Sequence, residues 1–357
     1  MSETFSIQSY RGEYRVHFTG DIAQVLATEV APADLVVMDR VVHDLYPALS
    51  DVLSERTVML MDATEEAKSF DQVAPLIQTM IDRNMGKGSR LIAIGGGVVQ
   101  DLVSFTASIF KRGSDWVFVP TTLLAQCDSC IGSKTSINFR ETKNQLGSFH
   151  AARAIYIDTR FLKTLPAIEL RAGLGEMFHY YLVSGDEDYR WAAERVANAL
   201  DHDDILHAFI HRSLKIKKAM IERDEFDAGP RNVFNYGHTF GHALEVATQY
   251  AVPHGIAVAI GMELANRVSV RMGLLDEAVR RDVHGALRHI WTADDCPPVE
   301  TDAYWGAIRQ DKKNIGNQIN AILSRGIGDM FKTPLPDDEK TTGFINDYLR
   351  GQRWLEV

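Results

Sequence analysis

The first half of the chain alternates short apolar runs with segments whose apolar residues recur at helical spacing. Five runs read as buried strands, because each is short, rich in branched or aromatic residues and followed by a turn or polar residue: 35–39, 58–62, 91–95, 116–120 and 154–158. The segments near 66–84 and 98–110 have helical spacing. This alternation predicts an α/β domain with an open, mostly parallel sheet.

Beyond about Leu162 the pattern changes. Strand-like runs nearly vanish, apart from a short one at 318–324, and long amphipathic segments follow near 167–183, 187–200, 203–224, 231–248 and 255–273. We therefore expect two domains, an α/β domain over residues 1–161 and an all-helical domain over residues 162–357.

Composition narrows the choice of partners. The 357 residues are 45% hydrophobic and 24% charged, as in a globular protein, and the net charge of -10 argues against nucleic acid or an anionic membrane as the main partner. A local basic pocket can still bind an anionic substrate. No apolar run approaches transmembrane length, and the first residues lack the basic and apolar regions of a signal peptide. With only three cysteines, the chain fits a reducing cytoplasm.

Residues 231–242 carry the strongest chemical signal. Read as one helix, Arg231, Asn235, His238 and His242 fall at i, i+4, i+7 and i+11, and therefore on one stripe. Because each polar group would need a partner once buried, this stripe suits a cleft that holds a metal and an anionic ligand. A solvated helix face with chance histidines is the alternative.

A glycine-rich turn, Gly95, Gly96 and Gly97, stands where a strand gives way to a helix, with Asp101 four residues on. Glycines let the backbone approach a pyrophosphate, and the N-terminus of a helix favours its negative charge. This pattern indicates nucleotide binding, although such a turn is often only a turn.

Polar residues also gather between the fourth and fifth strand-like runs, at Asp128, Lys134, Lys143 and Asn144. They suit a phosphate or carboxylate, while ordinary surface lysines are the alternative. Asp128 lies inside a C-x-x-C pair, and we interpret the two cysteines as small flanking residues, with a redox role as the weaker hypothesis.

Glu176 lies on a mostly apolar helical segment, where a carboxylate needs a partner. With His238 and His254 it would form a Glu/His/His set that leaves a metal position open for substrate. A carboxylate buried against an arginine is the competing account.

Several motifs occur in an order that resembles the sugar phosphate cyclase superfamily, and in particular its 3-dehydroquinate synthase-like members. The likeness covers about residues 30–330 and rests on GGGVVQD (95–101), VPTTLLAQCDS (119–129), GSKTSIN (132–138), KN (143–144), GLGE (173–176), FNYGHTFGHALE (234–245), PHG (253–255) and DKKN (311–314).

The resemblance implies an NAD-binding, Rossmann-like N-terminal domain, a C-terminal domain that holds zinc or cobalt, and a homodimer. Carried over by motif, the metal ligands would be Glu176, His238 and His254. NAD would lie against Asp39, Glu65, Lys68, Gly95, Gly96, Gly97, Asp101, Thr121, Thr122 and Lys143. The phosphate end of the substrate would meet Lys134, Asn144, Asn235, His242 and one lysine of the pair Lys312 and Lys313.

The resemblance also implies roles for other polar residues. Lys217 and Arg231 look like the pair that meets a substrate carboxylate, and Arg112 looks like an arginine that reaches the neighbouring subunit. Asp128 and His179 complete the expected catalytic set. The implied reaction is redox-neutral: transient oxidation of a secondary alcohol by NAD, β-elimination of phosphate, reduction, ring opening and an aldol closure.

Three positions depart from the family pattern. His179 stands where a lysine is usual, and we expect an altered substrate contact there, with a fourth metal ligand as the alternative. Gln100 replaces a usual glycine, and Ser133 replaces a second glycine before Lys134. These changes bear on the identity of the substrate more than on the reaction type.

We therefore predict a cytoplasmic cyclase that acts on an anionic, DAHP-like sugar phosphate, where DAHP is 3-deoxy-arabino-heptulosonate 7-phosphate. The paired Lys217 and Arg231 favour a substrate with a carboxylate. A specialised-metabolism cyclase acting on sedoheptulose 7-phosphate or another sugar phosphate is the second interpretation. A polyol dehydrogenase of the glycerol dehydrogenase type is the third, and a non-enzymatic regulator that binds metal or nucleotide is the last.

Overall fold

The computed structural model describes residues 3–140, 142–310, 319–335 and 338–356. The chain divides into two compact units. Unit 1 comprises Met1–Leu165 and Lys217–Phe226, and unit 2 comprises Pro166–Ile216 and Asp227–Val357. The expected boundary after residue 161 lies close to the first junction, whereas the return of 217–226 to unit 1 has no signal in the apolar pattern.

Unit 1 is built on a seven-stranded sheet in the order β1-β2-β9-β6-β5-β3-β4. β1 is antiparallel to β2, and the other neighbouring strands are parallel. The strands are β1 (Thr4–Ser9), β2 (Gly12–Phe18), β3 (Leu35–Asp39), β4 (Thr57–Met61), β5 (Leu91–Gly95), β6 (Trp116–Pro120) and β9 (Ala154–Ile157). The five strands predicted from apolar runs therefore form, and the mostly parallel sheet is confirmed.

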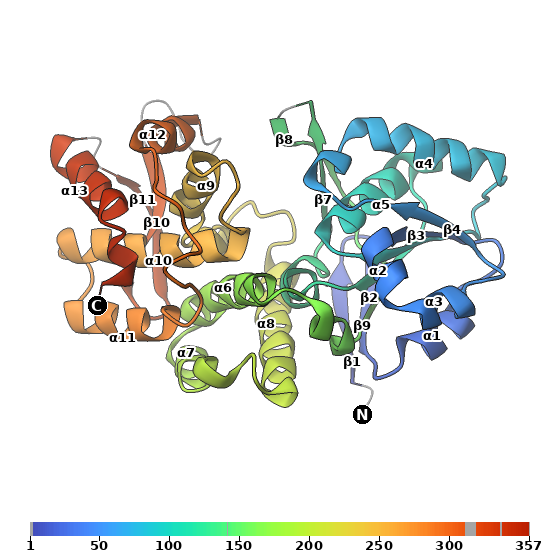
Figure 1. Ribbon diagram of the computed structural model, residues 1–357, viewed down its shortest axis with the longest axis horizontal. Coiled ribbons are helices and arrows are strands. Elements are labelled where there is room, and N and C mark those ends of the chain that lie inside the picture. The colour runs from blue at the N-terminus through green and yellow to red at the C-terminus, as the bar shows by residue number, and fades with distance from the viewer. Residues whose placement is uncertain (1–2, 141, 311–318, 336–337, 357) are drawn as a thin grey trace. The chain divides into compact units, whose positions relative to one another are not determined.

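Helices cover both faces of this sheet (Figure 1). Successive strand residues point to opposite faces, so Val36 and Met38 of β3 pack in one cluster with Ile22 and Leu26 of α1. The predicted helices near 66–84 and 98–110 correspond to α4 and α5. The helical elements are α1 (Ile22–Glu29), α2 (Arg40–Leu45), α3 (Pro47–Val52), η1 (Glu65–Ala67), α4 (Phe70–Asp82), α5 (Gly97–Ile109), η2 (Phe110–Arg112), the π-helical η3 (Ala125–Ser129) and η4 (Thr159–Thr164).

Two hairpins of unit 1 were not predicted. One is β1–β2, and the other joins β7 (Lys134–Phe139) to β8 (Thr142–Phe149) in a separate two-stranded sheet. None of the described residues of β8 is fully buried, so this strand has no apolar run that the sequence could reveal. The hairpin matters for function because it carries Lys134, Lys143 and Asn144.

Within its described residues, unit 2 is helical, with one two-stranded antiparallel sheet. Its helices are α6 (Ala167–Ser184), α7 (Asp186–Ala193), η5 (Val196–Asn198), α8 (Asp203–Arg223, whose last residues belong to unit 1), η6 (Pro230–Asn235), α9 (His238–Ala247), α10 (His254–Arg271), α11 (Glu277–Leu287), α12 (Thr301–Gln310), α13 (Glu339–Arg350) and η7 (Arg353–Leu355). The sheet pairs β10 (Ile319–Gly326), which the run at 318–324 predicted, with β11 (Asp329–Leu335), which was not predicted. The second unit is therefore not all-helical in the strict sense.

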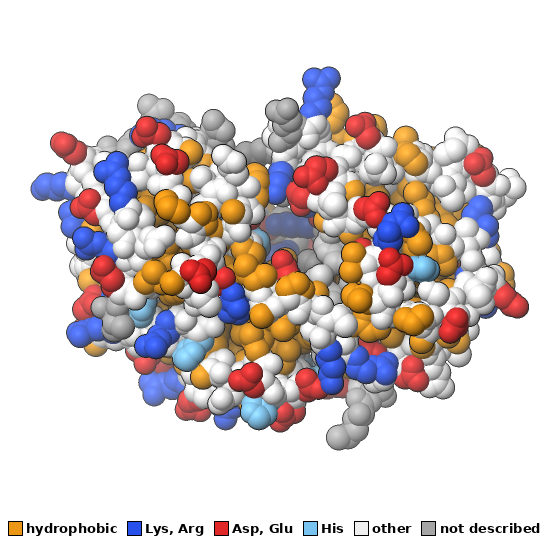
Figure 2. Space-filling view, viewed as in Figure 1, with side chains coloured by type: hydrophobic (Ala, Val, Ile, Leu, Met, Phe, Trp, Pro, Cys, Tyr) orange, Lys and Arg blue, Asp and Glu red, His pale blue; other side chains and the backbone are white. Residues whose placement is uncertain are grey.

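Acidic and basic side chains are interspersed over the face drawn in Figure 2. Among the described residues, no helix combines the length and apolar character needed to cross a membrane.

Candidate functional site

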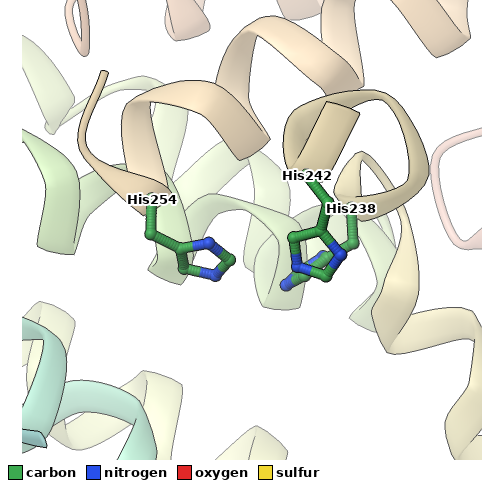
Figure 3. Close-up of side chains that lie close together, drawn as sticks. All are labelled: His238, His242 and His254. Carbon is green, nitrogen blue, oxygen red and sulfur yellow. The ribbon is translucent and has the colours of Figure 1, made fainter. Parts of the chain in front are cut away.

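Three helices of unit 2 bring a carboxylate and three imidazoles together. Glu176 lies on α6, His238 and His242 lie on α9, and His254 begins α10. Oε1 of Glu176 is 3.6 Å from Nε2 of His238, and its Oε2 is 3.4 Å from Nε2 of His254. Figure 3 shows the three imidazoles side by side, and ligand atoms from all three lie within 4.8 Å of one another.

Glycines beside these residues let the helices approach closely. A Cβ on Gly255, next to His254, would lie 1.7 Å from the carbonyl oxygen of Ala172 on α6. A Cβ on Gly175, next to Glu176, would lie 2.1 Å from the carbonyl oxygen of Gly255. Any larger residue would therefore separate α6 from α10. The close backbone packing explains how short side chains reach one another from different helices.

The Nδ1 atoms of His254 and His238 each lie near an oxygen that accepts hydrogen bonds. Nδ1 of His254 is 3.1 Å from Oε2 of Glu245, and Nδ1 of His238 is 3.3 Å from the carbonyl oxygen of Tyr236. Since both partners accept hydrogen bonds, both Nδ1 atoms donate, and in a neutral ring Nε2 then presents a lone pair. In neutral rings two such lone pairs would face the Glu176 carboxylate, and on His254 a bound metal would replace the proton that Nε2 shares with Glu176. This arrangement fits a cation, and Zn²⁺ or Co²⁺ suits its nitrogen and oxygen donors.

The pKa shifts of Glu176 and His254 agree with a site for a cation. Burial alone would raise the pKa of Glu176, but His179, His238 and His254 hold it well below its usual range. Burial would lower the pKa of His254, yet its hydrogen bonds with Glu176 and Glu245 raise that pKa well above its usual value. The site therefore favours an ionised carboxylate and attracts positive charge.

Two further imidazoles lie next to the expected ligands. His242, predicted to meet the substrate phosphate, stacks on His254 with ring centroids 5.5 Å apart, so it is also placed to reach a metal. His179 is buried, and its Nδ1 lies 3.5 Å from Oε1 of Glu176. His179 thus lies beside the carboxylate within unit 2, and its role as a substrate contact stays a prediction.

The single helix predicted over 231–248 is wrong. The chain forms η6, turns at Tyr236 and Gly237, and begins α9 at His238. Gly237 has φ +81°, and a Cβ there would lie 2.6 Å from both a Met262 side-chain carbon and the Val258 carbonyl oxygen. The break lets the turn pack on α10. His238 and His242 still share one face, but Arg231 and Asn235 belong to another element and not to the same stripe.

The predicted nucleotide residues lie at the carboxyl ends of adjacent parallel strands of unit 1. β3 ends at Asp39, β5 at Gly95 and β6 at Pro120, directly before Thr121 and Thr122. A Cβ on Gly96 would lie 2.9 Å from Cγ2 of Thr122, whereas a Cβ on Gly97 would meet no atom within 4 Å. No side chain caps the N-terminus of α5. Open space in front of an uncapped helix suits a pyrophosphate.

A polar network joins several of the other expected NAD residues. Lys68 Nζ lies 2.7 Å from Oδ2 of Asp101 and donates to Oδ1 of Asn144 at 2.9 Å. Glu65 lies 3.6 Å from Lys143 Nζ. Burial raises the pKa of Asp101, although the neighbouring Lys68 opposes this rise. Asn144, expected at the substrate phosphate, is therefore placed beside residues expected at the cofactor.

Lys217 is almost fully buried in unit 1, where Nζ donates to Oδ1 and to the carbonyl oxygen of Asp128, each at 2.7 Å. The thiols of Cys127 and Cys130 beside Asp128 are also buried, and burial raises the pKa of Cys130 to about 12. A thiol so reluctant to ionise is a poor redox group, which favours the interpretation of the C-x-x-C pair as flanking residues.

The remaining predicted residues lie elsewhere. Lys134 is exposed at the start of β7, Arg231 is buried in η6, and Asn235 donates to the carbonyl oxygen of Asn232 at 3.1 Å. Arg112 is exposed, with φ +66°. Lys312 and its neighbour Lys313 lie outside the described residues.

Two groups near the imidazoles were missed from the sequence. Glu245 supports His254, and the main chain of Tyr236 supports His238. Glu245 stands seven residues after His238, so its spacing places it on the same helix face and offered a usable signal. The Tyr236 carbonyl had no such signal, because its direction depends on the turn at Gly237.

Comparison with known families and curated proteins agrees along most of the chain. The 3-dehydroquinate synthase N-terminal family model matches residues 58–172, and the C-terminal model matches 173–314. The 3-dehydroquinate synthase of Alkaliphilus metalliredigens (strain QYMF) is 34% identical over 354 residues, covering 97% of this chain and 99% of that protein. The enzyme of Caulobacter vibrioides (strain NA1000 / CB15N) is 42% identical over 275 residues, covering 75% and 74%.

Solved structures share the fold. A 2-deoxy-scyllo-inosose synthase complexed with carbaglucose-6-phosphate, NAD⁺ and Co²⁺ has a TM-score of 0.87 at 24% identity, covering 98% of this chain and 100% of that one. The 2-epi-5-epi-valiolone synthase of Streptomyces hygroscopicus subsp. jinggangensis 5008, with NAD⁺ and Zn²⁺ bound, has a TM-score of 0.82 at 28% identity, covering 95% and 97%. With both halves matched by the family models, the chain belongs to the 3-dehydroquinate synthase family.

Proposed function

We propose that this protein is an NAD- and divalent-metal-dependent cyclase that eliminates phosphate from a DAHP-like 7-phospho-heptulosonate and forms a 3-dehydroquinate-like carbocycle. The observation that carries the proposal is the convergence of Glu176, His238 and His254, a ligand set that suits Zn²⁺ or Co²⁺ and leaves a position for substrate. Membership of the family supports the reaction class.

The cofactors follow from the residues present. Glu176, His238 and His254 would hold the metal, and the turn at Gly95–Gly97 would face the pyrophosphate of NAD. The NAD⁺ and Co²⁺ or Zn²⁺ bound in two structures of similar fold support both assignments. When bound, NAD would transiently accept a hydride from a secondary alcohol that the metal polarises.

The chain's own side chains would bind and orient the substrate. Lys217, held by Asp128, and Arg231 would bind the substrate carboxylate, because charge-assisted hydrogen bonds from such groups are strong and directional. Lys134 and Asn144 on the β7–β8 hairpin would stabilise the departing phosphate after the neighbouring C–H has become acidic. Glu245 would keep His254 in the correct tautomer.

The test is phosphate release by the purified protein with NAD and Zn²⁺ or Co²⁺, with DAHP and sedoheptulose 7-phosphate offered in parallel. We expect release from DAHP, a dehydroquinate product and no net NADH. Steady NADH formation from a polyol such as glycerol, without phosphate release, would overturn the proposal in favour of a dehydrogenase.

A cyclase that acts on sedoheptulose 7-phosphate is the second candidate. It is supported by His179, an imidazole packed against Glu176 where the family pattern has a lysine, and by the fold shared with 2-epi-5-epi-valiolone synthase. Such a substrate has no carboxylate for Lys217 and Arg231. Release from sedoheptulose 7-phosphate alone would establish this candidate in place of the first.

We also propose that the active form is a homodimer in which Arg112 reaches the neighbouring site. Arg112 is exposed in a left-handed backbone conformation at the end of η2, so its side chain extends from a tight turn. Sedimentation velocity checks the dimer. A monomer with full turnover would contradict this assignment.

A further inference from the structure

Gln100 makes a reciprocal pair of hydrogen bonds with the turn that carries Asp128. Gln100 lies on α5, is 6% exposed, and donates from Nε2 to the carbonyl oxygen of Ser129 at 2.6 Å. Its Oε1 accepts from the hydroxyl of Ser129, also at 2.6 Å. The Gln100 amide thus pairs with both the carbonyl oxygen and the hydroxyl of Ser129. Two bonds to one residue fix its position and its orientation.

The residue before Ser129 holds the buried ammonium of Lys217. Asp128 accepts from Lys217 Nζ through Oδ1 and through its own carbonyl oxygen, each at 2.7 Å. Lys217 is 5% exposed, and an ammonium buried to that extent needs such partners. An ammonium has three protons, so two directed at Asp128 leave one for an anionic ligand.

These contacts form one continuous chain within unit 1, from α5 through Gln100, Ser129 and Asp128 to Lys217. The backbone around Asp128 is a π-helix, Ala125–Ser129, whose wider turn is less regular than an α-helix. The bonds from Gln100 and Lys217 support this irregular turn from outside, in addition to the backbone bond that the Asp128 carbonyl oxygen accepts from the N–H of Ile131.

We propose that Gln100 is a positioning residue that fixes the Asp128–Ser129 turn and thereby aims the Lys217 ammonium at the carboxylate of the substrate. The substrate part of this inference rests on the proposed function. Gln100 bonds to Ser129 and acts on Lys217 only through the turn.

The test compares Gln100→Met, which keeps length and loses both hydrogen bonds, with Ser129→Ala, which loses only the hydroxyl's bond. The matched control is Ser108→Ala, on the same helix, whose hydroxyl donates only to the carbonyl oxygen of Phe105. The first readout is hydrogen–deuterium exchange of the 124–131 segment, which needs no substrate. We expect faster exchange in Gln100→Met, a smaller change in Ser129→Ala and none in the control.

The second readout separates positioning from general structural support. We expect Gln100→Met to raise the KM for DAHP about tenfold, with the Kd for NAD unchanged, a tenfold change being about 1.4 kcal/mol. Combined with Lys217→Met, it should add no further loss, because both changes remove the same contact.

Unchanged exchange in both variants would overturn the inference, as would a KM that does not move or losses that add in the double variant. Failure of the wild-type protein to bind DAHP or release phosphate from it would overturn the proposed function. In that case the exchange measurement still decides whether Gln100 fixes the turn.

Discussion

The nucleotide turn of unit 1 and the histidine cluster of unit 2 are assembled in opposite ways. At the nucleotide turn, Asp39, Gly95 and Thr121 come from the ends of neighbouring parallel strands, so the sheet itself places them together. In the cluster, Glu176 and His254 come from helices that approach only because Gly175 and Gly255 lack side chains. The first site follows from topology and the second from close packing of helices.

This difference has consequences for substitution. Around the turn, a Cβ on Gly97 would meet nothing within 4 Å, so change there tests the space in front of the helix. In the cluster, a Cβ on Gly255 would meet backbone at 1.7 Å, so change there tests the packing that brings the ligands together. We therefore expect Gly255 to tolerate an added side chain less well than Gly97.

The largest effect is expected from Glu176→Gln. Glu176 would itself bind the metal, so loss of its charge should weaken metal binding by more than about 100-fold. That exceeds the usual loss when a residue that only hydrogen-bonds to a metal ligand is replaced. Turnover should vanish with the metal. Metal content by elemental analysis and chelator competition checks this. Glu169→Gln, exposed on the same helix, should bind metal normally. Near-normal turnover in Glu176→Gln would remove the metal assignment.

Gly255→Ala should have the next largest effect. The added methyl would force α6 and α10 apart and lower the free energy of unfolding by about 3 kcal/mol, with metal affinity reduced as well. Urea unfolding of the metal-free protein measures the first part. Gly285→Ala on α11, where a Cβ meets no atom within 4 Å, should instead stabilise by up to about 1 kcal/mol. Equal stability of the two variants would show that the close approach is unimportant.

Glu245→Gln should have a moderate effect. The amide can still face His254 but carries no charge, so metal affinity should fall by roughly tenfold, within the range seen for outer carboxylates. Calorimetric titration of the metal-free protein with Zn²⁺ gives the value. Val246→Ala, exposed on the same helix, provides the comparison. An unchanged Kd for Zn²⁺ would mean that Glu245 does not support His254.

Much of this arrangement could be predicted from the sequence, and the omissions have physical reasons. The strands at 35–39, 91–95 and 116–120 are continuous apolar runs, as buried parallel strands require, and they locate the turn directly. By contrast, the break at Gly237 depends on contacts with α10 that no local pattern reveals. The β7–β8 hairpin lacked an apolar run, and the bond between Gln100 and Ser129 depends on the shape of a π-helical turn.

Gly97→Ala should have the smallest effect, and it distinguishes a change in NAD binding from a change in the free energy of unfolding. Because a Cβ there meets no protein atom, the free energy of unfolding should stay the same or rise by up to about 1 kcal/mol. If a pyrophosphate lies against this turn, the methyl would occupy part of its space and raise the Kd for NAD about tenfold, or about 1.4 kcal/mol. Fluorescence titration with NADH measures that Kd, and Gly88→Ala, also in open space but away from the turn, is the control. Unaltered NADH binding in Gly97→Ala would place the dinucleotide elsewhere and leave the glycine turn as a purely structural connection between β5 and α5.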